Sequence, residues 1–426
     1  MGYEQKPDAH PGAVFSCRPE PPHLGAPMEE PLPEVAIVRC EAYEREKIER
    51  AVSEAVERVG GVRQFVSRGE RIIVKPNLLS AAAPEHAVTT HPLVVEAICG
   101  LVRTAGAEPI IADSPGSGIP HREDRLPRLY ETTGMAAAAE RAGAVLNLDT
   151  SVTELSCPEG VAVKRLHVMQ PVLQADGIIN APKLKTHSFM MLTLATKNMF
   201  GVVPGLAKPG YHAKLRVVDR FADMLLDILA TVPPRLNVMD AVVGMDGEGP
   251  GRAGRPRGMG IILASTDAIS LDAVACRIVG LEPHRLPLLA AAQRRGLWDP
   301  AADPPTVVGL SIGDDAVADF RMPSAVVGPG GLVAQAWYER LLFPLLRNHL
   351  NARPVPQRPR CTACGTCVNA CPEQAIRIVK KLAVIDDRKC IRCYCCHEVC
   401  PEAAIDLRFT WLGRLARQQG LMGGAN

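Results

Sequence analysis

The chain has 426 residues, of which 47% are hydrophobic, and its formal net charge is only +2. This length predicts two or more domains, whereas the near balance of charge and the 4% content of aromatic residues argue against a nucleic acid as partner. No run of the sequence approaches the eighteen or so consecutive apolar residues that a membrane-spanning helix requires, so we expect no transmembrane segment.

Residues 1–33 are rich in Pro, Glu and Gly and show no basic, apolar and cleavable signal sequence. We therefore expect a disordered tail there. From residue 34 onward, short apolar runs typical of buried strands alternate with segments of helical periodicity. This alternation predicts an α/β domain over residues 34–322, with a mostly parallel sheet flanked by helices.

The expected strands are apolar runs at residues 35–38, 71–74, 109–112, 144–148, 177–180, 236–239 and 260–264. The expected helices cover residues 43–59, 91–103, 126–142, 214–230 and 268–279. Gly60 and Gly61 end the first helix, and Pro92 suits the first turn of the second. Thr266 or Asp267 is expected to cap the last helix.

The character of the chain changes over residues 323–360. Residues 334–350 carry Trp337, Leu341 and Leu345 at helical spacing, which predicts an amphipathic helix. Its apolar face packs against its own domain, or else meets a partner or a membrane surface. Residues 351–356 contain two prolines and predict a stiff linker into the next module.

Residues 361–408 contain two cysteine runs of the form C-x2-C-x2-C-x3-C-P, a pattern typical of [4Fe–4S] proteins. Each cluster needs four thiolates, and the fourth is borrowed from the other run. We therefore expect one set of ligands for cluster I, consisting of Cys361, Cys364, Cys367 and Cys400. The set for cluster II consists of Cys390, Cys393, Cys396 and Cys371. Zinc sites and a disulfide knot are the alternatives, which two complete runs disfavour.

Each run is followed by a similar apolar stretch, E-Q-A-I at 373–376 and E-A-A-I at 402–405, which indicates an internal duplication. The segment closely resembles bacterial two-cluster ferredoxin domains. Cys395 departs from the pattern, and we expect a packed thiol beside the cluster or, alternatively, a substitute ligand. His397 is expected at the surface. The tail 409–426 extends an apolar surface or docks the module onto the large domain.

Polar residues follow the expected strands of the large domain, and in open parallel sheets ligands bind beyond the carboxyl ends of the strands. These residues are therefore expected around one pocket: Lys75, Asn77, Asp113, Ser114, Lys183, Lys185, His187, Asp240 and Asp267. Glycine-rich loops at 113–118 and 244–251 could let the backbone approach an anion, or they are ordinary turns. Neither loop matches a Walker A or a dinucleotide-binding fingerprint.

The run P-K-L-K-T-H-S-F-M-M-L-T-L-A-T-K-N-M-F-G-V-V-P-G at residues 182–205, followed by Lys208 and His212, resembles the DUF362 family. So do V-K-P-N at 74–77, A-D-S-P-G at 112–116 and M-D-G-E-G-P-G at 245–251. The resemblance covers residues 35–312, and it implies a C-terminal two-cluster ferredoxin module, which many members carry. A more distant likeness, to the N-terminal domain of the nickel-pincer lactate racemase family, concerns the fold alone.

We expect four lysines to hold an anionic small-molecule substrate, namely Lys75, Lys183, Lys185 and Lys197, with Lys185 also close to the chemistry. His187 and His212 are candidates for acid–base catalysis or metal binding. Asn77, Ser114 and Asn198 would orient the ligand. Asp113, Asp240 and Glu248 would place a proton or a cation. The alternatives are solvated lysines, packed histidines, helix caps and Asx turns. No role follows from the sequence for Asp272.

Two functions fit these observations. The first is an iron–sulfur oxidoreductase, in which two [4Fe–4S] clusters pass low-potential electrons from a ferredoxin-like protein to a substrate or a further, unidentified cofactor in the large domain. The second is a non-enzymatic electron-transfer subunit or a cofactor-assembly protein. A redox-inert role remains a third, lesser alternative. Oxygen-sensitive clusters and five further cysteines without paired spacing predict a cytoplasmic location.

Overall fold

The computed structural model describes residues 34–116, 119–205, 207–301, 304–315, 317, 319–324 and 351–418. The predicted tail 1–33 and the predicted helix 334–350 lie outside these residues. The described residues belong to one compact unit that begins at Pro33. Among them, no helix is both long and apolar enough to cross a bilayer.

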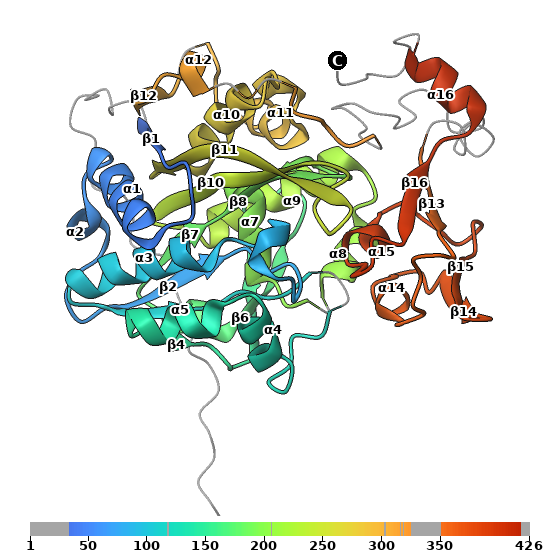
Figure 1. The fold of residues 1–426 in the computed structure, drawn as a ribbon, viewed down its shortest axis with the longest axis horizontal. Helices are drawn as coiled ribbons and strands as arrows, with labels where there is room; N and C mark the ends of the chain where they lie inside the picture. Colours follow the sequence, from blue (N-terminus) through green and yellow to red (C-terminus); the bar gives the residue numbers. More distant parts are fainter. Residues whose placement is uncertain are drawn as a thin grey trace, which may run out of the picture. The chain divides into compact units, whose positions relative to one another are not determined.

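A ten-stranded sheet forms the centre of the α/β part of the chain (Figure 1). Eight of its strands lie side by side in the order β12 (Thr306–Gly309), β1 (Glu34–Arg39), β11 (Gly254–Ser265), β10 (Leu236–Gly247), β7 (Gly177–Ala181), β2 (Arg71–Pro76), β3 (Glu108–Ile111) and β4 (Val145–Leu146). β8 (Lys183–His187) pairs with β10, and β9 (Met191–Thr193) pairs with β8. Neighbours are parallel except where β11 or β9 takes part. The predicted α/β class is confirmed.

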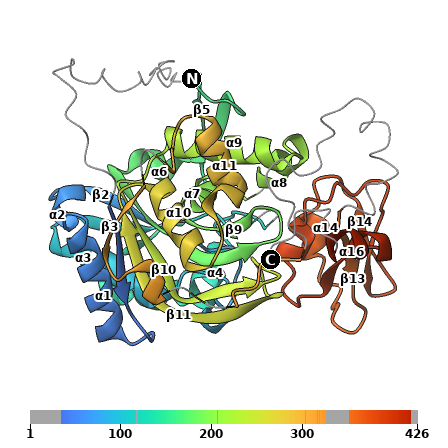
Figure 2. The ribbon, with the colours of Figure 1, turned by 90° about the horizontal axis from the view of Figure 1, so that it is seen from above.

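Each face of the sheet carries its own apolar core. In β2, Ile73 belongs to one core, whereas Ile72 and Val74 belong to the other, because successive strand residues point to opposite faces. One face is covered by α1 (Arg45–Arg58), α2 (Val62–Phe65), α3 (Pro92–Thr104), α4 (Leu126–Thr132) and α5 (Met135–Ala142). The other is covered mainly by α7 (Ala195–Asn198), α9 (Val218–Thr231), α10 (Ala268–Ile278) and α11 (Pro287–Arg294) (Figure 2). Because helices cover both faces of the sheet, side chains on both sides of each strand are buried, and the strand sequences are continuous apolar runs.

Smaller elements complete this part of the chain. The hairpin of β5 (Val152–Ser156) and β6 (Arg165–Met169) and the short α6 (Gln170–Gln174) pack on the second core. The remaining elements are η1 (Pro84–His86), η2 (Met199–Val202), α8 (Lys208–Lys214), η3 (Pro283–Arg285) and α12 (Ile312–Asp315).

Two predicted helices are wrong in extent. The helix expected at 126–142 is two helices, because Gly134 adopts the left-handed φ of +76° between α4 and α5, just before the Ala-rich run. The helix expected from 214 begins only at Val218, and Lys214 instead ends the separate α8. Asp267 caps α10 as predicted, with its carboxylate accepting hydrogen bonds from Ile269 N and Ser270 N.

Three placements at the sheet edge also need correction. Residues 183–187 form a strand, β8, rather than a loop after a strand. Asp240 lies inside β10, which is much longer than predicted because it forms a hairpin with β11. Since β11 runs antiparallel to β10, Asp267 lies at the opposite edge of the sheet from the ends of β2 and β3.

The cysteine-rich module contains two small antiparallel sheets. One pairs β13 (Arg353–Pro356) with β16 (Ile405–Arg408), and the other pairs β14 (Ile376–Val379) with β15 (Leu382–Ile385). The two related helices α14 (Thr366–Asn369) and α15 (Cys395–Glu398) each begin after a residue with positive φ, Gly365 and Tyr394. A final helix, α16 (Trp411–Gln418), follows β16. Leu407 and Phe409 pack against an apolar cluster that contains Ala352 and Tyr394 together with core residues of the α/β part.

Candidate functional site

A cavity of about 50 Å³ lies beyond the ends of β2 and β3, beside β8, α7 and α8. Eight of the polar residues singled out in the sequence line it, namely Asn77, Asp113, Ser114, Lys185, His187, Lys197, Asn198 and His212. Lys208, Thr193, Phe200 and Glu398 line it as well. Lys183, Asp240 and Glu248 are not among its lining residues, and Lys75 lies behind Asp113.

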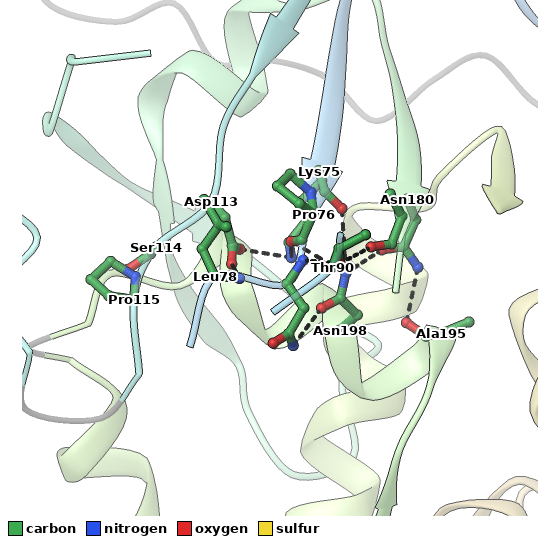
Figure 3. Close-up of polar contacts among 12 residues, drawn as sticks. Lys75, Pro76, Leu78, Thr90, Asp113, Ser114, Pro115, Asn180, Ala195 and Asn198 are labelled. Atoms are coloured by element: carbon green, nitrogen blue, oxygen red, sulfur yellow. Dashed lines mark hydrogen bonds and ion pairs between the residues drawn. The ribbon is translucent and has the colours of Figure 1, made fainter. Parts of the chain in front are cut away.

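The lining residue Asp113 forms a buried ion pair with Lys75, which lies behind it. Lys75 Nζ lies 2.8 Å from Asp113 Oδ1, and both side chains are almost fully shielded from solvent. Asp113 Oδ2 also accepts a hydrogen bond from Leu78 N at 2.7 Å (Figure 3). Burial lowers the pKa of Lys75, an effect that the Asp113 carboxylate opposes. A Cβ atom at Gly201 would fall 2.0 Å from Asp113 Oδ1, so this close approach requires glycine.

A chain of side-chain amides connects the cavity with the interior of the sheet. Asn77 Nδ2 donates to Asn198 Oδ1, Asn198 Nδ2 donates to Asn180 Oδ1, and Asn180 Nδ2 donates to Asn237 Oδ1, at 2.7–2.9 Å. Asn180 also donates to Ala195 O (Figure 3). Since each amide is both donor and acceptor, the chain fixes the orientation of Asn77 and Asn198 at the cavity.

Lys185 is buried without a carboxylate partner. Its Nζ donates to Asn77 Oδ1 at 2.8 Å, and also to the carbonyl oxygens of Val88 and Pro250. Burial, and then the nearby charge of Lys197, hold its pKa well below the usual value. These three neutral oxygens solvate the ammonium group but do not neutralise it.

Two further lysines enter the cavity from α7 and α8. Burial lowers the pKa of Lys197 to about 8 and that of Lys208 to about 7. Lys208 Nζ donates to Ser114 O at 2.8 Å and Pro115 O at 2.6 Å. Among the described residues, Lys197 has no hydrogen-bonding or ion-pairing partner, although the Glu398 carboxylate is close enough to oppose the fall in its pKa. Lys208 was part of the family resemblance, but not of the predicted site.

Asp272 explains how α7 presents Lys197 and Asn198. Its carboxylate accepts hydrogen bonds from Ala195 N at 2.7 Å and Thr196 N at 3.1 Å, the first two residues of that helix. Burial raises the pKa of Asp272 to about 7. The acidic residue inside the apolar helix α10 therefore holds the first turn of α7, which carries Lys197 and Asn198, a role that sequence periodicity cannot reveal.

The two predicted histidines are buried and differ in their hydrogen bonds. His187 Nδ1 accepts from Phe189 N and Met190 N, which leaves the proton on Nε2, 3.3 Å from Glu398 Oε1. His212 stacks on Phe221, and its Nδ1 has no hydrogen-bond partner in the described structure. Burial and nearby lysines lower the pKa of His187 well below its usual value and that of His212 to about 3, so both are neutral near pH 7.

Glu398 brings the cysteine-rich module to the cavity. It is the last residue of α15, the helix that also contains Cys396. Burial raises its pKa to about 7, an effect that Lys197 and Lys185 oppose. No sequence signal distinguishes Glu398 from other acidic residues of the module, so the prediction missed it.

His397, next to Glu398, is buried and not at the surface as predicted. Its ring nitrogens lie 2.6 Å from Ile405 O and 3.0 Å from Glu248 O. It therefore links α15 to the loop after β10.

Lys183 and Asp240 form a separate cluster. Lys183 Nζ lies 2.7 Å from Asp240 Oδ2 and 2.8 Å from Tyr43 Oη, and Tyr43 donates to Asp240 Oδ1. His91 stacks on Tyr43 with ring centroids 3.6 Å apart. These contacts satisfy the charged groups, as in a buried structural ion pair. Glu248 lies elsewhere, and its carboxylate accepts from Ser324 N.

The eight cysteines of the two runs gather in two separate groups. Cys361, Cys364, Cys367 and Cys400 line one cavity, and Cys371, Cys390, Cys393 and Cys396 line another. In each group one thiol accepts a backbone N–H bond at 3.2 Å, from Ala404 to Cys400 and from Ala375 to Cys371. Four cysteines around a cavity, three from one run and one from the other, fit a [4Fe–4S] cluster. Cys395 is fully buried and lines neither cavity.

Known protein families match both the α/β part and the cysteine-rich module of the chain. The family model of a domain of unknown function, DUF362, matches residues 72–277, and a 4Fe-4S dicluster domain matches residues 360–404. A thylakoid-associated protein from Synechocystis is 32% identical over 278 residues, which cover 63% of this chain and 81% of that protein. The chain belongs to the DUF362 family. The predicted family and C-terminal module are confirmed, and the dicluster domain supports iron–sulfur binding by this DUF362 protein.

Two solved structures are similar to part of this DUF362 protein. The lactate racemase apoprotein from Thermoanaerobacterium thermosaccharolyticum is 13% identical with a TM-score of 0.31, and the match covers 50% of this chain and 51% of that one. A protein from Thermotoga maritima is 14% identical with a TM-score of 0.32, over 53% and 56% of the two chains. The match therefore spans about half the length of each solved chain.

Proposed function

We propose that this DUF362 protein is an iron–sulfur redox protein whose two [4Fe–4S] clusters exchange low-potential electrons with a small molecule held in the cavity beside α15. Cys361, Cys364, Cys367 and Cys400 would hold cluster I. Cys390, Cys393, Cys396 and Cys371 would hold cluster II. Bound there, the clusters would accept and release electrons one at a time, so a ferredoxin-like protein is the expected donor or acceptor.

The observation that carries the proposal is the position of Glu398. It lines the cavity together with Lys185 and Lys197, and it lies two residues after Cys396, one of the cysteines that would hold cluster II. A Cβ atom at Gly251 would fall 2.1 Å from Glu398 O, so the backbones of the two parts of the chain are in close contact. A ligand in the cavity would therefore lie close to one cluster site.

The chain's own residues can prepare a ligand for reduction. Lys185, fixed by Asn77, and Lys197, held in place through Asp272, present ammonium groups. Neutral His187 and His212 lie beside them. Such groups can stabilise negative charge that develops on a substrate, and a neutral imidazole can accept or donate a hydrogen bond.

A non-enzymatic electron-transfer or assembly role is the second candidate, and α16 favours it. Trp411, Leu412 and Leu415 on this helix are 65%, 41% and 47% exposed. Exposed apolar groups on one helix are typical of docking surfaces. In this role the cavity lysines would be dispensable and α16 would not. The boundaries 34–322 for the α/β domain and 361–408 for the cluster module are part of the same proposal.

Anaerobic redox titration followed by electron paramagnetic resonance tests the main proposal. Iron and sulfide analysis should first show two clusters in the wild-type protein and in the variants Lys197→Met and Lys214→Met. Lys197→Met removes a cation near α15, so it should lower the midpoint potential of one cluster, because the reduced form loses a favourable interaction. Lys214 lies at the end of α8 and does not line the cavity, and its replacement should leave both potentials unchanged. Equal potentials in all three proteins would refute electrical contact between cavity and clusters.

A further inference from the structure

We propose that the cavity beside α15 binds a small oxyanion, of the size of a short carboxylate or a sulfate ion. This assigns a substrate class to the site, and it rests on the proposed function only for the fate of the ligand after binding.

The charges around the cavity are not balanced by the protein. Lys75 and Asp113 neutralise each other at 2.8 Å. Three more lysines, Lys185, Lys197 and Lys208, line the cavity, whereas Glu398 is the only other carboxylate among the described lining residues. Lys185 and Lys208 are buried, and Lys197 is partly buried. Buried charges in proteins are normally paired, so this excess of ammonium groups favours an anionic ligand.

Two hydroxyl groups on residues that line the cavity lack hydrogen-bond partners in the described structure. Ser114 Oγ and Thr193 Oγ1 belong to side chains that are 2% exposed, and neither makes a hydrogen bond. Lys208 uses two of its three N–H groups, on Ser114 O and Pro115 O. These hydroxyl and ammonium donors, together with Lys197, match the several lone pairs of an oxyanion.

The size and walls of the cavity limit the ligand. About 50 Å³ admits roughly three or four water-sized groups, which suits one oxyanion with few further atoms. Leu79 and Phe200 add apolar surface to the lining, and Gly116 and Gly201 allow close backbone approach. A Cβ atom at Gly116 would fall 2.7 Å from Leu79 Cδ1, so this wall has no room for a side chain.

Isothermal titration calorimetry on the full-length, oxidised holoprotein under anaerobic conditions tests the proposal. The probes are sodium acetate, sodium sulfate and the neutral acetamide, at constant ionic strength set with sodium chloride. Acetate or sulfate should bind with one site per chain, and acetamide should not. If only acetate saturates the site, the preferred ligand is a planar carboxylate. If only sulfate saturates it, the preferred ligand is a tetrahedral oxyanion.

Matched variants locate the site. Lys208→Met should weaken binding on the order of tenfold to a hundredfold, because a charge-assisted hydrogen bond is lost. Lys214→Met, on the same helix but outside the cavity lining, should bind as the wild type does. Equal weakening in both variants, equal binding of acetamide, or no binding of either anion to the wild-type protein would overturn the proposal.

The two proposals can fail separately. Calorimetry uses the oxidised protein without an electron donor, so it reports only on the cavity. Anion binding without any effect of Lys197→Met on cluster potentials would refute the redox coupling and leave the oxyanion site standing. A shifted cluster potential in Lys197→Met without anion binding to the wild-type protein would refute the oxyanion site and leave the redox coupling standing.

Discussion

Replacement of Gly251 by alanine should disturb the contact between the two parts of the chain. Gly251 lies in the loop between β10 and β11, and a Cβ atom there would be 2.1 Å from Glu398 O and 3.0 Å from Glu398 C. Both neighbouring atoms belong to the backbone and cannot rotate away. The loop and α15 must therefore separate by about 1 Å before the oxygen reaches an acceptable distance.

Overpacking of this kind lowers the free energy of unfolding by about 1–3 kcal/mol when the surroundings cannot adjust. In this protein the contact between the loop at Gly251 and α15 can open. The substitution should therefore weaken the packing of α15 against the loop, in addition to lowering the free energy of unfolding. Hydrogen exchange measured by mass spectrometry should show faster exchange at residues 395–400 in Gly251→Ala. The exchange of β2 and β7, in the centre of the sheet, should not change.

Gly258→Ala is the matched control. Gly258 lies in β11 and has no positive φ, and a Cβ atom there would meet no atom of a more distant residue within 4 Å. Its replacement should be neutral or slightly stabilising, because alanine restricts the unfolded chain. If Gly251→Ala and Gly258→Ala show the same exchange at α15 and the same stability, Glu398 is not held at the cavity by this contact.

Three further outcomes are expected. Cys371→Ala should reduce the iron and sulfide content from that of two clusters to that of one, whereas Cys395→Ala should retain both; loss of a cluster in the second variant would make Cys395 a ligand. The affinity for sulfate, whose charge is constant, should fall as the pH rises through about 7 to 8, because Lys208 and Lys197 lose their protons there, and a pH-independent affinity would contradict this. The pKa of Asp272 in the folded protein, about 7, exceeds the ordinary value of 3.8, so its contribution to stability should decline as the pH rises toward 7. Denaturant titrations at several pH values should show this slope in the wild type but not in Asp272→Asn.

The sheet was predictable because its strands are covered on both faces, so that runs such as residues 71–74 contain only apolar residues after the first. Strand direction was not predictable in the same way. The reversal of β11, which places Asp267 at the opposite edge, depends on a hairpin with β10, and the loop 248–253 that joins the two strands matches no short turn motif singled out in the sequence. Likewise, the left-handed conformation of Gly134 separates α4 from α5, and a Cβ atom there would fall 3.0 Å from Pro92, about forty residues away along the chain.

The candidate site was predictable where it follows the ends of parallel strands, as for Asn77, Asp113 and Ser114. Lys208 and Thr193 belong to the segments that resemble the family but were not assigned to the site, and nothing in the local sequence distinguishes Glu398. Glu398 in particular reaches the cavity only because α15 packs against the loop at Gly251. A site completed by another part of the chain leaves no local pattern.

Lys183 and Lys185 show why a lysine motif alone does not define a site. They lie two residues apart on β8, and both are about 1% exposed. Lys183 meets Asp240 and the Tyr43 hydroxyl group, so its charge is compensated by the protein. Lys185 donates hydrogen bonds only to amide and carbonyl oxygens, and no carboxylate pairs with it directly, although the charges of Glu398 and Asp113 partly offset those of Lys197 and Lys183. Since a buried charge without a direct partner destabilises the fold, the contrast with Lys183 supports the proposed anionic ligand in the cavity that Lys185 lines.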